Sequence, residues 1–414
     1  MSAVRDFRSK TFAALQVRNF RLYFFGQLVS VSGTWMQSVA QGWLRLQLTD
    51  SAVDLGTSIA LQYLPMLFFA SYGGLVADRL PKRRILYVTQ ASAGVLAVIL
   101  GLMVTTHHAT VIAVYVLSFL LGVVNLFDMP ARQAFVQQMV GKELIANAVS
   151  LNSVLMNAGR LVGPAISAGV IALFGTASCF YVNAASYAAV IVALWLMNEE
   201  DFAPMRNVVR SKGQLRLGLR YAWGTPLIRR VLVAVALVGT FAFNFTTTLP
   251  LLSRHSFHEH SAGAYSVLLS AMGLGAVMGG LYIAHRSRPN MGLLTTEGIL
   301  FGLSMTGVAF SPNVACAAIF LVCTGAFSIS FVSTANAILQ LNSAEQMRGR
   351  VMSLHGTAFL GSTPIGAPLI GWIISQSNAR VGIFVGAMVA LGTGLMLLRA
   401  LAKERQHGAT PAPN

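Results

Sequence analysis

The chain has 414 residues, of which only 10% are charged and 55% are hydrophobic. A soluble domain has about 25% charged residues, so this composition excludes an ordinary soluble globular protein. A membrane-spanning helix needs about 20 mainly apolar residues, and the length therefore allows about a dozen spans with short connections. The apolar segments are continuous rather than alternating, which favours helices over a β-barrel.

The formal net charge of +16 would suggest nucleic-acid binding in a soluble domain. Here the Lys and Arg residues lie in short connectors between apolar runs, as membrane insertion predicts. We therefore expect a monomer whose partners are the lipid bilayer and a small-molecule substrate, with no nucleic acid. The chain contains neither a phosphate loop of the GxxxxGKS type nor a nucleophile elbow, so we expect no enzyme and no cofactor.

Hydrophobic periodicity predicts twelve spans, six in each half of the chain. The first six cover residues 20–43, 55–77, 85–105, 110–130, 145–173 and 177–197. The second six cover residues 229–252, 263–284, 291–310, 313–339, 350–375 and 380–401. The first run is too long for the core of a cleaved signal peptide, so we expect it to be retained.

These spans divide the chain into five parts. They are an N-terminal segment 1–19, a six-helix bundle 20–198, a linker 199–228, a second six-helix bundle 229–402 and a tail 403–414. Lys and Arg concentrate in alternate connectors, which places both termini in the cytoplasm of a bacterial-type inner membrane. In the linker, Leu215, Leu219 and Trp223 have helical spacing beside Arg216 and Arg220, which predicts a basic interfacial helix.

An internal repeat indicates that the two halves are related. Val149-Ser150-Leu151 resembles Met352-Ser353-Leu354, and Gly163 occupies a position equivalent to Gly366. The predicted fold is therefore an all-α membrane protein of twelve transmembrane helices, arranged as two pseudo-symmetric six-helix bundles around a central cavity.

Several motifs resemble those of the major facilitator superfamily. The segment from Gly74 to Arg84, with Pro81 in place of the usual glycine, resembles the signature loop of that superfamily. Gly159 to Pro164 resembles the glycine-proline motif of its exporters. Asp128 to Gln133 and Gly33 to Gln37 resemble the subgroup that includes siderophore and macrolide exporters. The resemblance implies alternating access and proton-coupled efflux of a small organic molecule, driven by a proton gradient.

Polar residues at helical spacing predict a substrate cavity. In the first span they occupy an arc of about 80°, and they line either a cavity or a contact between helices. These residues are Gln27, Ser30, Thr34, Gln37 and Gln41. In the seventh span they are Thr240, Asn244 and Thr247, interleaved with Phe241, Phe243 and Phe245, which suit either a ligand or a packed core. Asn125 and Arg160 complete the predicted lining. Arg160 lies deep in a span, where it contacts an anionic substrate, takes part in proton coupling or forms a fixed structural pair.

The expected gating and coupling residues lie toward the cytoplasmic side. They are Asp78, Arg79, Lys82, Arg83, Asp128, Arg132 and Glu297. The resemblance implies that Asp128 meets Lys82 or Arg83, while Asp78 accepts from the amide end of the helix that begins near Arg350. Spacing alone offers Arg132 as another partner for Asp128. Glu297 either releases a proton when it is hydrated or snorkels to the surface.

Two further sets of residues have simpler interpretations. Gly159, Gly163, Pro164 and Gly366 are expected to allow close packing of helices. His258 and His260 flank Glu259 in an outer loop, but the sequence offers no fourth ligand, so we expect no metal site. Two other functions stay open: a facilitator or importer on the same fold, and a membrane receptor or scaffold that transports nothing.

Overall fold

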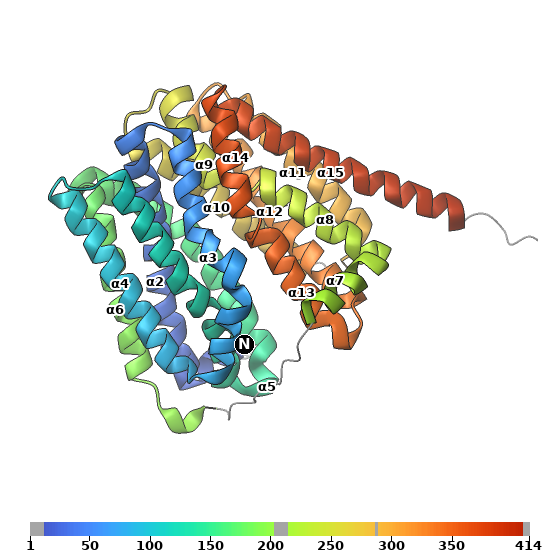
Figure 1. Cartoon of the computed structure of the whole chain (residues 1–414), viewed down its shortest axis with the longest axis horizontal. Coiled ribbons are helices and arrows are strands. Elements are labelled where there is room, and N and C mark those ends of the chain that lie inside the picture. Colours follow the sequence, from blue (N-terminus) through green and yellow to red (C-terminus); the bar gives the residue numbers. More distant parts are fainter. Residues whose placement is uncertain (1–11, 203–213, 286–288, 409–414) are drawn as a thin grey trace, which may run out of the picture. The chain divides into compact units, whose positions relative to one another are not determined.

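The structure is a computed structural model of the chain, and it describes residues 12–202, 214–285 and 289–408 (Figure 1). All regular elements in these residues are helices. Eleven of the described helical segments are long and apolar enough to cross a membrane, which makes this a multi-pass membrane protein. The chain divides into two compact units, residues 1–50 with 61–209, and residues 51–60 with 210–414.

Unit 1 contains the helices of the first half of the chain. They are η1 (Ala13–Gln16), α2 (Arg18–Thr49), residues 61–79 of α3 (Ala52–Arg79), α4 (Lys82–Thr105), α5 (Val111–Phe174), α6 (Thr176–Trp195) and η2 (Glu199–Asp201). The fourth and fifth predicted spans form the single element α5, which changes direction at Gly141. The φ of Gly141 is +69°, a conformation that glycine adopts without a steric penalty. The expected connector between these spans is therefore helical almost throughout.

Close packing holds α2 against its neighbours in unit 1, where it contacts both α5 and α6 (Figure 1). A Cβ atom on Gly163 would lie 2.5 Å from the Ser32 carbonyl oxygen and 2.6 Å from the Trp35 Cβ. Gly159 approaches Val31 in the same way. The two glycines thus allow α2 and α5 to come into backbone contact, as small residues do between membrane helices.

Unit 2 contains the start of α3 and the helices of the second half of the chain. They are α7 (Gln214–Gly224), α8 (Pro226–Phe241), α9 (Phe245–Leu251), η3 (Leu252–Ser256), α10 (Ala262–His285), α11 (Met291–Ala309), α12 (Val314–Asn342), α13 (Glu345–Leu360), α14 (Thr363–Ser375) and α15 (Ala379–Gly408). α12 packs on α10 and α11, and α11 packs on α15. The seventh predicted span is broken between α8 and α9, and the eleventh is broken between α13 and α14.

Glycine contacts also organise unit 2. Gly366 of α14 approaches the Thr240 carbonyl of α8, and Gly56 of α3 approaches the Ala367 carbonyl of α14. A Cβ atom on Gly371 would lie 2.5 Å from the Ala52 carbonyl oxygen. These contacts explain why the first residues of α3 group with unit 2, although the sequence places the whole second span in the N-terminal bundle.

The linker helix α7 covers the residues for which the sequence predicts an interfacial helix. Leu219 and Trp223 are exposed together with Arg216 and Arg220. The opposite side of α7 contacts unit 2, because the Tyr221 hydroxyl accepts a hydrogen bond from the Ala344 amide at 3.0 Å. An exposed face that mixes apolar and basic side chains is typical of a helix at the membrane surface.

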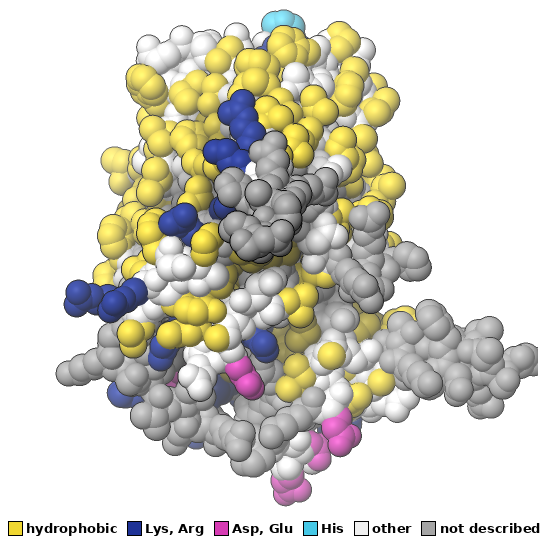
Figure 2. All heavy atoms as spheres, turned by 90° about the vertical axis from the view of Figure 1, so that its right-hand side faces the viewer, with side chains coloured by type: hydrophobic (Ala, Val, Ile, Leu, Met, Phe, Trp, Pro, Cys, Tyr) yellow, Lys and Arg dark blue, Asp and Glu magenta, His cyan; other side chains and the backbone are white. Residues whose placement is uncertain are grey.

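The surface is rich in exposed hydrophobic side chains. Examples are Phe68, Leu173, Trp195, Phe310 and Trp372. Hydrophobic side chains cover much of the face drawn in Figure 2. Monomeric soluble proteins rarely expose apolar patches of this extent, and lipid is the environment that accommodates them.

Candidate functional site

A buried ion pair joins three helices of unit 1. The Asp128 carboxylate of α5 accepts from Arg132 Nε at 2.8 Å and Nη2 at 2.6 Å, through the same oxygen. Its other oxygen accepts from Thr89 Oγ1 at 2.7 Å and from Gln90 Nε2 at 2.8 Å, both on α4. Arg132 Nη1 also donates to the Gln27 side-chain oxygen on α2. Asp128 is 5% exposed, so its carboxylate is held by these side chains rather than by water.

Asp128 does not have the partner that the family resemblance implied. It pairs with Arg132, the alternative predicted by the spacing of one helical turn. Arg83 lies in the first turn of α4, whereas Asp128 contacts α4 at Thr89 and Gln90, on the order of 10 Å further along the helix. The predicted pair between Asp128 and Arg83 is therefore wrong, because Arg83 faces α6.

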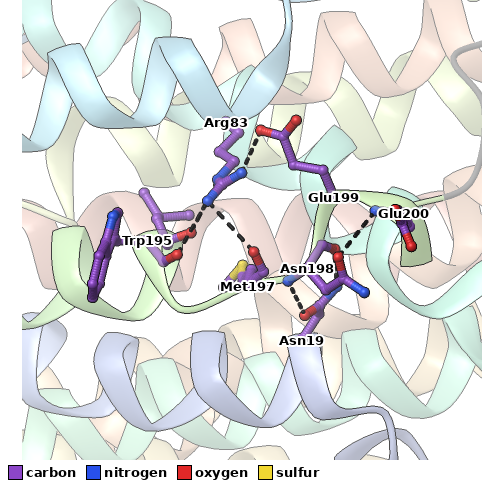
Figure 3. Close-up of polar contacts among 8 residues, drawn as sticks. Asn19, Arg83, Trp195, Met197, Asn198, Glu199 and Glu200 are labelled. Atoms are coloured by element: carbon purple, nitrogen blue, oxygen red, sulfur yellow. Dashed lines mark hydrogen bonds and ion pairs between the residues drawn. The ribbon is translucent and has the colours of Figure 1, made fainter.

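Arg83 binds the C-terminal end of α6 (Figure 3). Its guanidinium donates to the Leu194 carbonyl at 2.9 Å and the Trp195 carbonyl at 3.3 Å, and it forms an ion pair with Glu199. The last carbonyls of a helix have no partners within the helix and carry partial negative charge, which a cation at this end neutralises. The second arginine of the signature loop therefore joins α4 to α6.

The start of α2 is tied to the same place. Asn19 Nδ2 donates to the Asn198 carbonyl at 2.8 Å, and the Asn198 amide donates back to Asn19 Oδ1 at 3.1 Å (Figure 3). The beginnings of α2 and α4 and the segment after α6 thus meet in one polar cluster.

The rest of the signature loop forms a local turn. Lys82 is 8% exposed, and its ammonium group lies 3.4 Å from the Asp78 carbonyl oxygen. The Asp78 carboxylate interacts electrostatically with Lys82. Arg79 is exposed. The expected contact of Asp78 with the helix that begins near Arg350 would join the two units, and it stays a prediction.

The polar stripe of α2 is mainly an interhelical contact. Gln37 Oε1 accepts from Asn183 Nδ2 on α6 at 2.7 Å, and Gln41 Nε2 donates to Ser118 Oγ on α5 at 3.2 Å. Gln27 binds Arg132 as described above, and all three glutamines are at most 6% exposed. These contacts agree with the interhelical interpretation, because each side chain has a partner on a neighbouring helix of unit 1, and the cavity lining stays a prediction.

The other two residues of that stripe differ from each other. Ser30 is 3% exposed and lies with the buried glutamines, whereas Thr34 is exposed and donates to the Ser30 carbonyl at 2.9 Å. A face predicted from spacing alone is thus divided between a packed part and an exposed part.

The polar residues of the seventh span surround a break in the helix. Residues 243 and 244 are non-helical, and Asn244 Nδ2 donates to the Thr240 carbonyl at 2.7 Å. Asn244 and Thr247 are buried, and Thr240 is half-buried. The Asn244 amide therefore replaces a backbone donor that the break removes, and the lining of a cavity by Asn244 and Thr247 stays a prediction.

The aromatic residues of this span belong to a packed cluster in unit 2. The ring centroid of Phe243 lies 4.8 Å from that of Phe359, 5.6 Å from that of Phe301 and 6.3 Å from that of Phe245. Edge-to-face contacts of this kind stabilise a core. This arrangement agrees with the core interpretation of the aromatic residues rather than with a ligand site.

Glu297 lies inside unit 2 on α11. It is 3% exposed, and the next residue, Gly298, packs against the Gly394 Cα of α15. The carboxyl group therefore does not snorkel to the surface, and it is buried between helices at a depth where an acid is costly.

Arg160 lies on α5 and stacks on an aromatic ring of α2. Its guanidinium carbon is 4.9 Å from the centroid of the Trp35 ring, and the Tyr63 phenol on α3 lies within electrostatic range. All three side chains are half-buried, as is Asn125 on the first part of α5. Of the predicted lining residues in unit 1, Thr34, Asn125 and Arg160 are thus the ones that keep exposed surface.

Sequence reasoning missed a second polar stripe, on α5. Ser150 and Ser153 are exposed, and Asn157 is half-buried one turn before Arg160. Their steps of three and four residues place them on one side of the helix. The same spacing rule that was applied to the first span would have found them.

The outer-loop histidines form no metal site within the described part of the chain. No group of three or more His, Cys, Asp or Glu side chains is close enough there to hold an ion. His258 adopts a φ of +57° in the loop after η3.

The apolar helices and the exposed hydrophobic surface define a multi-pass helical membrane protein. A family model described as transmembrane secretion effector matches residues 9–411, and the chain belongs to this family of the major facilitator superfamily. It is a transporter rather than an enzyme, and its bacterial relatives place it in the plasma membrane.

Curated relatives match the chain over most of its length. It is 25% identical to the multidrug efflux pump Tap of Mycolicibacterium fortuitum, covering 92% of this chain and 94% of the relative. It is 25% identical to the staphyloferrin A transporter of Staphylococcus aureus, covering 81% and 84%. It is 24% identical to the enterobactin exporter EntS of Shigella flexneri, covering 95% and 94%.

Solved transporter structures share the fold. A POT family transporter in complex with 5-aminolevulinic acid aligns with a TM-score of 0.73 at 12% identity, covering 92% of this chain and 95% of that chain. The nucleoside transporter NupG aligns with a TM-score of 0.72 at 12% identity, covering 93% and 98%. At this identity the similarity concerns the fold alone.

Proposed function

We propose that the protein exports a small organic molecule from the cytoplasm by exchanging it for protons. The observation that carries the proposal is similarity along nearly the whole chain to a drug efflux pump and to a siderophore exporter. A match restricted to the signature loop would support the fold only, whereas this match extends over the helices of both halves of the chain.

We infer twelve spans, with α2 as the one beyond the eleven apolar segments. α2 has 32 residues, more than the roughly 20 that a span requires. Its buried glutamines and serine lower its apolar character, but their hydrogen bonds lie within unit 1, so α2 can cross the bilayer without exposing them to lipid. An even number of spans also agrees with two cytoplasmic termini.

Alternating access is the proposed mechanism, with the two halves of the chain opening a central site to one side and then to the other. The segment from Asp78 to Arg83 and the network around Asp128 lie near the predicted cytoplasmic ends of their helices, which suits a gate. Glu297, buried in α11, is the candidate for carrying the proton, because a buried carboxyl can exchange a proton when water reaches it.

Transport in everted membrane vesicles tests this function. A deletion strain is first screened with antibiotics and siderophores. The screen identifies an antibiotic to which the strain becomes sensitive, or a siderophore that it no longer releases. That molecule should accumulate in everted vesicles when their interior is acidic, and Glu297→Gln should abolish the dependence on the pH gradient. Accumulation that ignores the gradient would indicate a facilitator, and no movement of any molecule would indicate a receptor or scaffold.

A further inference from the structure

The middle of unit 1 contains a charged side chain with no acidic partner in the described part of the chain. Arg160 lies near the centre of the span Glu143–Phe174. Two ion pairs of unit 1, Arg83 with Glu199 and Arg132 with Asp128, involve other residues. A charged arginine at this depth is costly, so it requires compensation from its surroundings.

A contact with the Trp35 ring compensates Arg160 in part, without using its hydrogen-bond donors. The Trp35 ring lies 4.9 Å from the guanidinium carbon, and the Tyr63 phenol is within electrostatic range. A cation–π contact occupies the face of the guanidinium, whereas its N–H donors point outward in the plane of the group. The stacking therefore fixes the orientation of Arg160 and leaves its edge able to bind a carboxylate or sulfonate.

Backbone packing holds these side chains together. The approach of Gly163 to Ser32 and Trp35 sets the distance between α2 and α5 directly beside Arg160. On α3, the Gln62 carbonyl lies against Gly122 in the first part of α5, before the kink at Gly141, so this contact packs α3 on a different span from the one that carries Arg160. A glycine contact thus sets the distance between the helices of Trp35 and Arg160, and another positions the helix of Tyr63 on the first part of α5.

A polar stripe on α5 leads to Arg160. At 100° per residue, Ser150, Ser153, Asn157 and Arg160 fall within an arc of about 80°. Their side chains are exposed or half-buried, although they lie on a membrane helix. Exposed polar groups are tolerated at membrane depth where they face water rather than lipid. The stripe therefore indicates a wetted side of α5 that runs from the cytoplasmic end of the span to Arg160.

We propose that Arg160, Trp35 and Tyr63 form a binding site for an organic anion that carries an aromatic or flat apolar body. The carboxylate or sulfonate of the ligand binds the edge of the guanidinium, and its apolar body lies against the aromatic side chains. The fixed positive charge disfavours cationic ligands of the same shape. This inference rests on the proposed transport function and names the class of its substrate.

A pair of probes that differ only in charge tests the site. Naphthoate and naphthamide have the same ring system, and their binding to purified full-length protein in nanodiscs is measured by equilibrium dialysis. We expect naphthoate to bind about tenfold more tightly than naphthamide, as expected for a hydrogen bond to a charged group. Arg160→Gln should remove this preference, and Trp35→Leu should weaken the binding of both probes.

Control variants separate charge from stability. Arg21→Gln removes an exposed arginine from the start of α2 and should leave the preference unchanged. If Arg160→Gln does not give a monodisperse protein, Arg160→Lys keeps the charge but loses the planar donor edge, and it should reduce naphthoate binding while sparing naphthamide. A wild-type protein without preference for naphthoate, or a preference that survives in Arg160→Gln and Arg160→Lys, would overturn the proposal.

The binding measurement is independent of proton coupling. If the protein prefers naphthoate through Arg160 but its transport does not depend on a pH gradient, the result supports the anion site and contradicts proton exchange. If the protein accumulates its substrate only when the vesicle interior is acidic, yet shows no charge preference, the result supports proton exchange and contradicts the anion site.

Discussion

Asp128 and Arg132 show how the solvent exposure of an ion pair changes its contribution to the stability of the protein. The side chain of Asp128 is 7% exposed, whereas that of Glu199, which pairs with Arg83, is 76% exposed. Breaking a buried pair leaves an uncompensated charge, but an exposed pair loses little because water replaces the partner.

We therefore expect Asp128→Asn to lower stability by about 3 kcal/mol, and Glu199→Gln to lower it by less than about 1 kcal/mol. Thermal unfolding of the detergent-solubilised protein, followed by gel filtration, measures the difference. The double variant Asp128→Asn with Arg132→Gln should be more stable than Asp128→Asn alone. Equal losses for Asp128→Asn and Glu199→Gln would contradict the structural assignment.

Gln37 and Asn183 form a second buried pair whose role can be separated from transport. Gln37→Leu removes the acceptor of Asn183 Nδ2, and an unsatisfied buried amide costs about 1 to 3 kcal/mol. Replacing both residues by leucine removes donor and acceptor together and should recover most of that loss.

Transport by the double leucine variant is the second measurement for this pair. Because the two buried side chains bond to each other, we expect the substrate to accumulate in everted vesicles at close to the wild-type rate. A stable double variant that no longer transports would show that Gln37 contacts the substrate after all.

The sequence predicted which side of a helix carries polar residues, but not what those residues contact. Spacing correctly grouped the polar residues of the first span on one side of its helix, but it could not tell which neighbour that side would meet. Gln37 and Gln41 are polar, as residues that line a cavity are, but their side chains bond to neighbouring helices. Arg160 could be found from its isolation in an apolar run, whereas Trp35 and Tyr63 lie on other helices and required the packing.

At the level of elements, glycine contacts decide how closely helices approach. A Cβ atom on Gly163 would meet backbone and side-chain atoms of α2, whereas one on Gly169, in the same helix, would meet nothing within 4 Å. Gly163→Ala should therefore destabilise the protein by about 1 to 3 kcal/mol through overpacking. Gly169→Ala should be neutral or slightly stabilising, because alanine favours helices.

Thermal unfolding in detergent compares the two alanine variants directly. Since Gly163 also positions Trp35, we expect Gly163→Ala to weaken naphthoate binding in the preparations that stay folded. Equal stability of the two variants would mean that α2 and α5 are further apart than the structure shows.

The existence of the elements was predictable, and their interruptions were less so. Continuous apolar runs locate most membrane helices within a few residues, because the thickness of the hydrocarbon sets their length. The breaks after Phe241 and after Leu360 fall at short polar stretches, Asn244 with the threonines that follow and Gly361 to Pro364, and a window of span length averages these residues with their apolar neighbours. At Gly141 the polar flanks suggested a long connector, whereas the structure has a kink at one residue between two helices.

For the whole molecule, the distribution of Lys and Arg predicts both termini on the cytoplasmic side. A variant without native cysteines can test this with one new cysteine at a time. His107→Cys lies in a predicted outer connector and Glu345→Cys in a predicted inner one, and both positions are exposed. An impermeant maleimide applied to intact cells should label the first, and it should label the second only after the membrane is opened. The reverse pattern would overturn the orientation.

The division of the chain followed the sequence repeat only in part. The internal repeat predicted two halves of six spans with a boundary in the linker, and residues 210–414 do form one unit. Residues 51–60 join that unit although they precede the linker by a long stretch of chain. The repeat reflects the similarity of the two halves, whereas the division into units reflects contacts in space. The contact of Gly56 with Ala367 is one of these, and aligning the two halves of the sequence cannot reveal it.

The interrupted seventh span has a mechanical consequence. With the Thr240 carbonyl satisfied by the Asn244 side chain, the two helical pieces are joined by a short stretch whose torsion angles can change without exposing a polar group to hydrocarbon. Such a joint lets α8 and α9 take different directions, with each piece packed on its own neighbours in unit 2. An unbroken rod of the same length would hold both pieces to one axis.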